Sequence, residues 1–142
     1  MGQKVKRVLQ KRRCRVEELL EIGKIKKELF RRKYNNIKTD KVIITQERIH
    51  HIQVRHPDDY ELFIKYRKEC VECPDIIIND DKNTETVFMI KKLSDMNLNI
   101  VIRLSLENEE NLLNHSVMTC WRIRNKNLKK MMRKNQILYK KE

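Results

Sequence analysis

The feature that most constrains the fold is a run of strand-like segments in the second half of the chain. Between residues 75 and 124, apolar and β-branched residues recur with the two-residue period of a β-strand. Short turns rich in Asn and Asp separate these segments, and connections of this length join neighbouring antiparallel strands. The sequence therefore predicts an antiparallel meander with strands over residues 75–79, 86–92, 98–106 and 116–124.

Helical spacing predominates before this meander. Residues 4–34 predict two helical pieces, although residues 19–25 also fit a short strand. Residues 42–44 predict a short extended segment, and Thr45 is a good N-cap for a helix over residues 46–55. This part of the chain is therefore expected to be mainly helical.

Proline residues predict where the next helices begin and end. Pro57 disfavours helical geometry at His56, so the first of these helices should end there. A second helix follows over residues 58–73, and a last helix follows residue 125, with a short terminal strand over residues 137–139. Helices followed by strands indicate an α+β fold, with N-terminal helices packed on a small antiparallel β-sheet meander.

Charge divides the chain into three parts. The 142 residues carry a formal charge of +13, of which residues 1–38 contribute +10, residues 39–121 contribute −5 and residues 122–142 contribute +8. We expect one domain, with residues 1–38 as a basic, largely helical N-terminal arm and residues 39–142 as the core. Basic ends suit a polyanion, and RNA, DNA or an anionic membrane would each satisfy the charge.

The sequence argues against membrane and cofactor functions. No apolar run approaches the roughly 20 residues that cross a bilayer, and there is no secretion signal, so a soluble, cytoplasmic protein is expected without a membrane partner. Cys70 and Cys73 form a C-x-x-C pair, but a zinc site needs a second pair at suitable spacing. We therefore expect reduced thiols, no metal and no cofactor.

Three of the four histidines, His50, His51 and His56, lie close together in the sequence. On a helix, His51 shares a face with Arg48 and Arg55. Imidazole titrates near neutral pH and moves protons, while cations stabilise a phosphate that becomes five-coordinate. The alternative is an exposed, basic helix face without a catalytic role.

The strands supply complementary groups. Arg103 lies within an apolar strand, where a charge needs a ligand or a salt bridge, and both alternatives remain open. Alternation sends one of Lys91 and Lys92 to each face of the sheet, and the pattern leaves open which one faces a site. Thr119 and Trp121 share a face, so a hydroxyl that binds phosphate lies beside a ring that stacks on a base; the alternative is an ordinary strand with a core tryptophan.

Taken together, these segments resemble the phage-associated barnase/EndoU/colicin/RelE-like nucleases. The resemblance covers most of the chain from about Ile22 onward, and its specific elements are the H-I and R-H-P motifs within VIITQERIHHIQVRHP and the N-x-S-x-x-T-x-W pattern of the late strand. It implies helices packed on a small antiparallel sheet with the active site on the exposed sheet face. It also implies metal-free cleavage by the ribose hydroxyl, leaving a cyclic phosphate.

The resemblance implies roles for individual residues. His51 or His56 is the acid/base candidate, Lys91 and Arg103 stabilise the phosphate, and Ser116 and Thr119 contact it. His115 departs from the plain Asn-Ser pair that the family pattern leads us to expect. The expected RNA contacts are Arg48, Arg55, Trp121, Arg122, Arg124, Lys129 and Lys130.

The resulting hypothesis is an endoribonuclease, with tRNA among its candidate substrates. Such an enzyme would poison its maker, so we expect an inhibitor or immunity protein, or delivery as a toxin to a target cell or in association with a virion. One alternative is a metal-dependent nuclease built on Asp75 and Lys91, but Met89 occupies the position of its second carboxylate. The other is a non-catalytic RNA- or DNA-binding or phage structural module.

Overall fold

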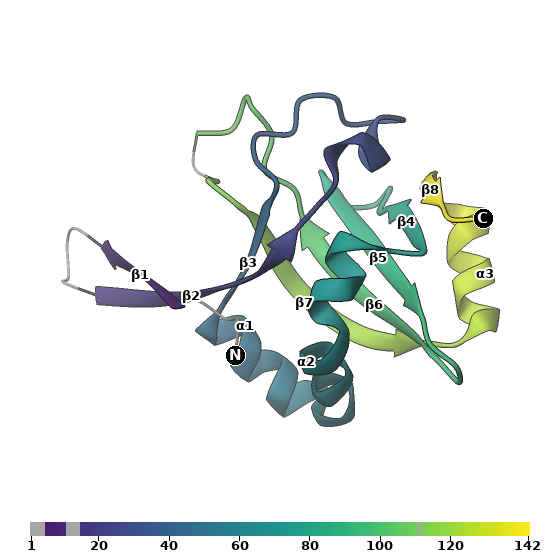
Figure 1. Cartoon of the computed structure of the whole chain (residues 1–142), viewed down its shortest axis with the longest axis horizontal. Helices are drawn as coiled ribbons and strands as arrows, with labels where there is room; N and C mark the ends of the chain where they lie inside the picture. The colour runs from purple at the N-terminus through teal and green to yellow at the C-terminus, as the bar shows by residue number, and fades with distance from the viewer. Residues whose placement is uncertain (1–4, 11–14, 111) are drawn as a thin grey trace.

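The computed structural model describes residues 5–10, 15–110 and 112–142 and has an α+β architecture (Figure 1), which confirms the predicted class. Its elements in chain order are β1 (Val5–Gln10), β2 (Arg15–Lys24), a short 3-10 helix η1 (Lys27–Phe30), β3 (Lys41–Thr45), α1 (Gln46–Arg55), α2 (Pro57–Glu72), β4 (Ile76–Asn79), β5 (Thr86–Lys92), β6 (Asn97–Arg103), β7 (His115–Ile123), α3 (Asn125–Lys134) and β8 (Ile137–Lys140).

The strands form one mixed sheet in the order β1-β2-β3-β7-β6-β5-β4-β8. β4 to β7 are antiparallel neighbours, whereas β3 runs parallel to β7 through the pairs Val42–His115 and Ile43–Ser116. β8 adds to the free side of β4, and the β1–β2 hairpin adds to the free side of β3. The prediction of a small antiparallel meander is therefore wrong in extent, because the meander is the centre of a larger mixed sheet.

The predicted N-terminal helices are wrong, because β1 and β2 occupy that region as an antiparallel hairpin. A short apolar pattern fits both the helical and the strand period. Here pairing with β3 stabilises the strand, which was the alternative stated for residues 19–25. Ile22 and Ile25 then enter the core. Gly23 lies at an irregular register, and a Cβ there would lie 3.3 Å from Glu72 Oε2, so glycine permits close packing against α2.

Strand alternation gives the sheet two faces with different helical cover. Met89, Ile100 and Cys120 are aligned across β5, β6 and β7 and pack in the main core with residues of α1 and α2; we call this the α2 face. On the opposite face, here called the α3 face, Ile90 packs with Leu128 of α3 in a second, smaller core. Every functional side chain on the central strands therefore belongs to one of these two environments.

Local signals set the boundaries of α1 and α2. The Thr45 hydroxyl accepts a hydrogen bond from Arg48 N at 3.2 Å, which caps α1 as predicted. α1 ends before Pro57, which begins α2, so His56 lies at the junction of the two helices. In the described part of the chain, no helix is both long and apolar enough to cross a membrane.

Candidate functional site

Four predicted site residues share the α3 face. The register between β6 and β7 places Arg103 beside Ser116, with Thr119 and Trp121 farther along β7 on the same side of the sheet. The Trp121 ring meets Phe88 edge to face, with centroids 6.3 Å apart. These side chains form a row of a cation, two hydroxyls and an aromatic ring.

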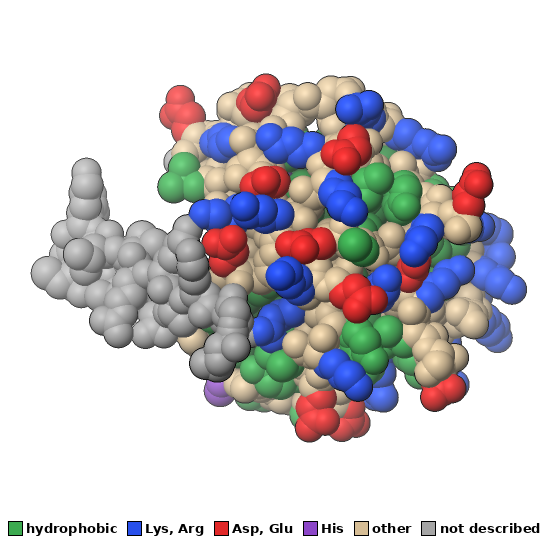
Figure 2. All heavy atoms as spheres, viewed as in Figure 1, with side chains coloured by type: hydrophobic (Ala, Val, Ile, Leu, Met, Phe, Trp, Pro, Cys, Tyr) green, Lys and Arg blue, Asp and Glu red, His purple; other side chains and the backbone are tan. Residues whose placement is uncertain are grey.

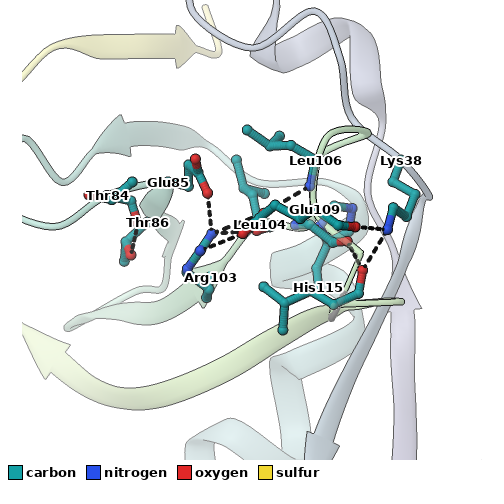
Figure 3. A network of polar contacts seen from close by, with 11 residues as sticks. Lys38, Thr84, Glu85, Thr86, Arg103, Leu104, Leu106, Glu109 and His115 are labelled. Carbon is teal, nitrogen blue, oxygen red and sulfur yellow. Dashed lines mark hydrogen bonds and ion pairs between the residues drawn. The ribbon is translucent and has the colours of Figure 1, made fainter.

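Carboxylates already bind both ends of the Arg103 guanidinium (Figure 3). Nη1 donates to Glu85 Oε2 at 2.6 Å, and Nη2 donates to Glu109 Oε2 at 2.7 Å. Partial burial opposes the charged form, but the hydrogen bonds to these two carboxylates raise the pKa of Arg103 above its usual value. The salt-bridge alternative for Arg103 agrees with these contacts, and a phosphate would have to displace a glutamate.

His115 forms hydrogen bonds that hold the loop between β6 and β7, which carries Glu109, against the segment before β3. Its Nδ1 accepts a hydrogen bond from Ser105 N at 2.9 Å, so Nε2 is the nitrogen that donates to Thr39 O at 2.6 Å. Lys38 Nζ donates to the carbonyls of Glu109 and Leu112 in the same network (Figure 3). Burial lowers the pKa of His115, which favours the neutral ring. The residue that departs from the family pattern thus has a structural role here.

Lys91 lies on the α2 face and is separated from Arg103 by the sheet. Its ammonium is 3.2 Å from Glu69 Oε2 and 3.8 Å from Asp75 Oδ2, and it donates to Cys73 O at 3.1 Å. Burial opposes its charge, but these partners raise the pKa of Lys91 above its usual value. Lys91 and Arg103 therefore do not lie over one phosphate as predicted, because they are on opposite faces of the sheet. Strand alternation places Lys92, and not Lys91, on the α3 face with Arg103.

The structure brings His56 and Arg122 together through a carboxylate. Asp59 lies three residues after His56 in α2, and its Oδ2 is 3.7 Å from His56 Nδ1. Asp59 Oδ1 accepts a hydrogen bond from Arg122 Nε at 2.6 Å across the α2 face. Asp59 is 9% exposed, whereas 42% of the Arg122 side chain is exposed. An imidazole, a buried carboxylate and an accessible guanidinium thus meet where α2 begins and β7 ends.

Asp59 is the functional candidate that sequence reasoning missed. Its spacing from His56 is visible in the sequence, but it is also ordinary for the acidic first turn of a helix. Its second partner, Arg122, is 63 positions away. A local pattern therefore could not have shown that the two predicted groups share one carboxylate.

The other predicted residues on α1 surround this junction. α1 packs on the α2 face, where buried Ile49 and Ile52 join the main core, and Arg48 Nη1 donates to Met118 O of β7 at 3.3 Å. His51 is half-buried and Arg55 is exposed. The histidines thus lie on the opposite side of the sheet from Arg103 and Thr119, and the predicted single cluster divides into two.

Basic side chains also gather around α3. Arg124, Lys129 and Lys130 are exposed, and the last turn of α3 carries Arg133 and Lys134. Lys and Arg crowd the side of the surface where α3 lies, whereas the front of the molecule has both signs of charge (Figure 2). This side of the molecule suits a polyanion.

Among the described residues, two of the three cysteines are buried and Cys73 is exposed, with Lys26 Nζ 3.8 Å from its sulfur. Cys70 and Cys120 are buried, and burial raises the pKa of the Cys120 thiol to about 12. Within residues 5–10, 15–110 and 112–142, no three His, Cys, Asp or Glu side chains lie close enough together to hold a metal ion.

Comparison with known proteins identifies the family to which the chain belongs. No curated protein and no solved structure matches the chain. The family model described as phage-Barnase-EndoU-ColicinE5/D-RelE like nuclease2 matches residues 17–140, which confirms the resemblance seen in the sequence motifs. The matched region contains α1, α2 and α3, and with them His56, Asp59 and Arg122. The chain therefore belongs to this family of phage-associated barnase/EndoU/colicin/RelE-like nucleases.

Proposed function

We propose that the chain is a metal-independent endoribonuclease that cleaves RNA by transphosphorylation, with His56, Asp59 and Arg122 at its centre. The contact chain from His56 through Asp59 to Arg122 carries the proposal. It supplies a proton acceptor, a group that orients it and a cation, which are the parts that this reaction needs. Membership of a nuclease family supports a nucleic-acid substrate.

In the proposed reaction, His56 takes the proton of a ribose 2′-hydroxyl. The 2′-oxygen attacks the adjacent phosphorus, and the bond from phosphorus to the 5′-oxygen breaks, leaving a 2′,3′-cyclic phosphate. The departing 5′-oxygen receives a proton from a general acid, for which His51 on α1 is the candidate. Asp59 orients the imidazole and stabilises its charged form, as carboxylates do for catalytic histidines.

Arg122 is the better of the two strand arginines for binding the reacting phosphate. Two carboxylates bind Arg103 at opposite ends, and only 26% of its side chain is exposed. Arg122 meets Asp59 through Nε, while its Nη2 lies 3.9 Å from Asp58, and more of its surface is open. A guanidinium held at one nitrogen keeps its remaining N–H groups for two phosphate oxygens. Ser116, Thr119 and Trp121 are proposed to contact RNA away from the scissile bond.

The proposal is tested by mapping the product ends of total RNA and of tRNA incubated with the purified chain in excess EDTA. We expect cyclic phosphate ends, no cleavage of an RNA with 2′-O-methyl groups, and a rate about 10²–10⁴-fold lower for His56→Ala. Arg122→Gln should cost about 10²–10³-fold. His50→Ala is the matched control, because it removes an exposed imidazole from α1, the helix that ends just before His56.

Three results would contradict this assignment. Full activity of His56→Ala would remove the histidine from the chemistry. Activity that EDTA abolishes and added Mg²⁺ restores would favour the metal-dependent alternative. If no preparation cuts RNA while the chain still binds it, the non-catalytic binding module remains.

A free ribonuclease endangers the cell that makes it, so we also propose an acidic inhibitor or immunity protein that covers the basic side around α3. Expression of the chain alone in bacteria should arrest growth, and expression of His56→Ala should not. Equal growth of both strains at equal protein level would count against such a partner.

A further inference from the structure

A cavity lies on the α3 face, beside α3 and on the opposite side of the sheet from the proposed centre. It has a volume of about 360 Å³ and lies between α3, the start of β4, the end of β5, the start of β6 and the end of β8. Its floor is apolar and its rim is basic. The floor includes Ile76, Leu128 and Met132, and the rim includes Lys92, Lys129 and Lys140.

Strand alternation explains why the three lysines converge. Lys92 follows Lys91, so the two side chains point to opposite faces, and Lys92 lies on the α3 face. Lys140 is paired with Ile76 in the ladder between β8 and β4, so its side chain shares the side of that floor residue. Lys129 comes from α3, and no Asp or Glu is among the residues that line the cavity.

Two amides, Asn97 and Asn125, also line the cavity where β6 meets the start of α3. Asn97 Nδ2 donates to Ile123 O at 3.0 Å and to Asn125 Oδ1 at 2.8 Å, which holds β6 against the start of α3. Asn97 is paired with Ile123, and the next residue of β6 is paired with Arg122. Two residues, Ile123 and Arg124, separate Arg122 from Asn125, and the Arg122 side chain points to the opposite face of the sheet.

We infer that this cavity binds one nucleotide of the RNA on the α3 face, where the RNA strand runs past the end of β7 and away from the scissile phosphate. Its apolar floor takes the face of a base, and its lysines take the adjoining phosphates, since base and phosphate recognition normally combine in this way on single strands. The inference rests on the proposed function for the identity of the polymer. The cavity would be a substrate-binding site separate from the proposed His56, Asp59 and Arg122 centre.

The charged rim is tested by fluorescence anisotropy with a labelled single-stranded RNA octamer bearing 2′-O-methyl groups, so binding is measured without cleavage. Replacing Lys92 and Lys140 by Gln should weaken binding about tenfold and lower the slope of log affinity against log salt by about 1.4. Lys126→Gln with Lys134→Gln is the matched control, because it removes the same charge from α3 outside the cavity. An equal loss in the control pair would overturn the site.

The apolar floor is tested by comparing the RNA octamer with an abasic chain of the same length and charge. Wild-type protein should prefer the RNA, and Met132→Gln should reduce this preference, whereas Met131→Gln on the neighbouring position should retain it. Unchanged discrimination in Met132→Gln would show that no base binds there. A chain that passes both binding tests but cuts no RNA would refute the proposed function and leave this site standing.

Discussion

Asn99 offers the sharpest test of the packing described above. Its side chain is fully buried on the α3 face, and neither its Nδ2 nor its Oδ1 has a hydrogen-bond partner among the described residues. The register places it between Ile90 and Trp121, in an apolar layer. An amide buried without a hydrogen bond costs about 1–3 kcal/mol, so Asn99→Leu, which has a similar shape, should raise the free energy of unfolding by that amount.

The matched control is Asn97→Leu, on the same strand and face. The Asn97 amide makes two hydrogen bonds, so its loss should destabilise the fold by about 1–3 kcal/mol. Urea denaturation gives both values, and the melting temperatures should move in opposite directions by about 4 °C per kcal/mol. If Asn99→Leu destabilises the protein as much as Asn97→Leu does, the Asn99 amide is paired and the reasoning fails.

Three further predictions follow from other contacts. Burial lowers the pKa of His115, so its contribution to the free energy of unfolding is fully present above pH 6.5 and is lost as the pH falls through the lower pKa of the folded state. The urea midpoint should therefore decline less between pH 7 and pH 5 in His115→Gln than in wild type. Thr45→Ala removes the cap of α1 and should cost about 1 kcal/mol in denaturant titrations, whereas Thr45→Ser should cost much less. Arg103→Gln leaves Glu85 and Glu109 facing each other and should cost about 1–2 kcal/mol, and a smaller loss for Arg103→Gln than for the exposed control Arg133→Gln would contradict the ion-pair network.

Local signals were sufficient for much of the fold. The two-residue period placed β4 to β7, and Thr45 and Pro57 fixed the ends of α1, because each of these signals acts within a few residues. The β1–β2 hairpin was mistaken for helix, because its partner β3 is contributed by a separate segment. The parallel contact of β3 with β7 joins residues more than 70 positions apart, and no local pattern encodes it.

The sequence predicted which residue types form the candidate site, but it did not predict which of those side chains lie together on one face of the sheet. His56, Arg103 and Arg122 were all expected to meet RNA, but the phase of each strand decides which face a side chain joins. That phase depends on the irregular register between β6 and β7, where Met118 has no paired residue. The sequence pattern also left open which of Lys91 and Lys92 faces which side of the sheet. The structure places Lys91 on the α2 face, where it contacts Glu69 of α2, and Lys92 on the α3 face.

The bond between Asp59 and Arg122 has a consequence during synthesis of the chain. Its two partners are 63 positions apart, and Arg122 belongs to β7, which is translated long after α1, His56 and α2. Synthesis from the N-terminus therefore delays assembly of the proposed centre until β7 has left the ribosome. Under the proposed function, the nascent chain lacks the arginine of its centre while the upstream message is being read, so it should not yet cleave the messenger RNA that encodes it.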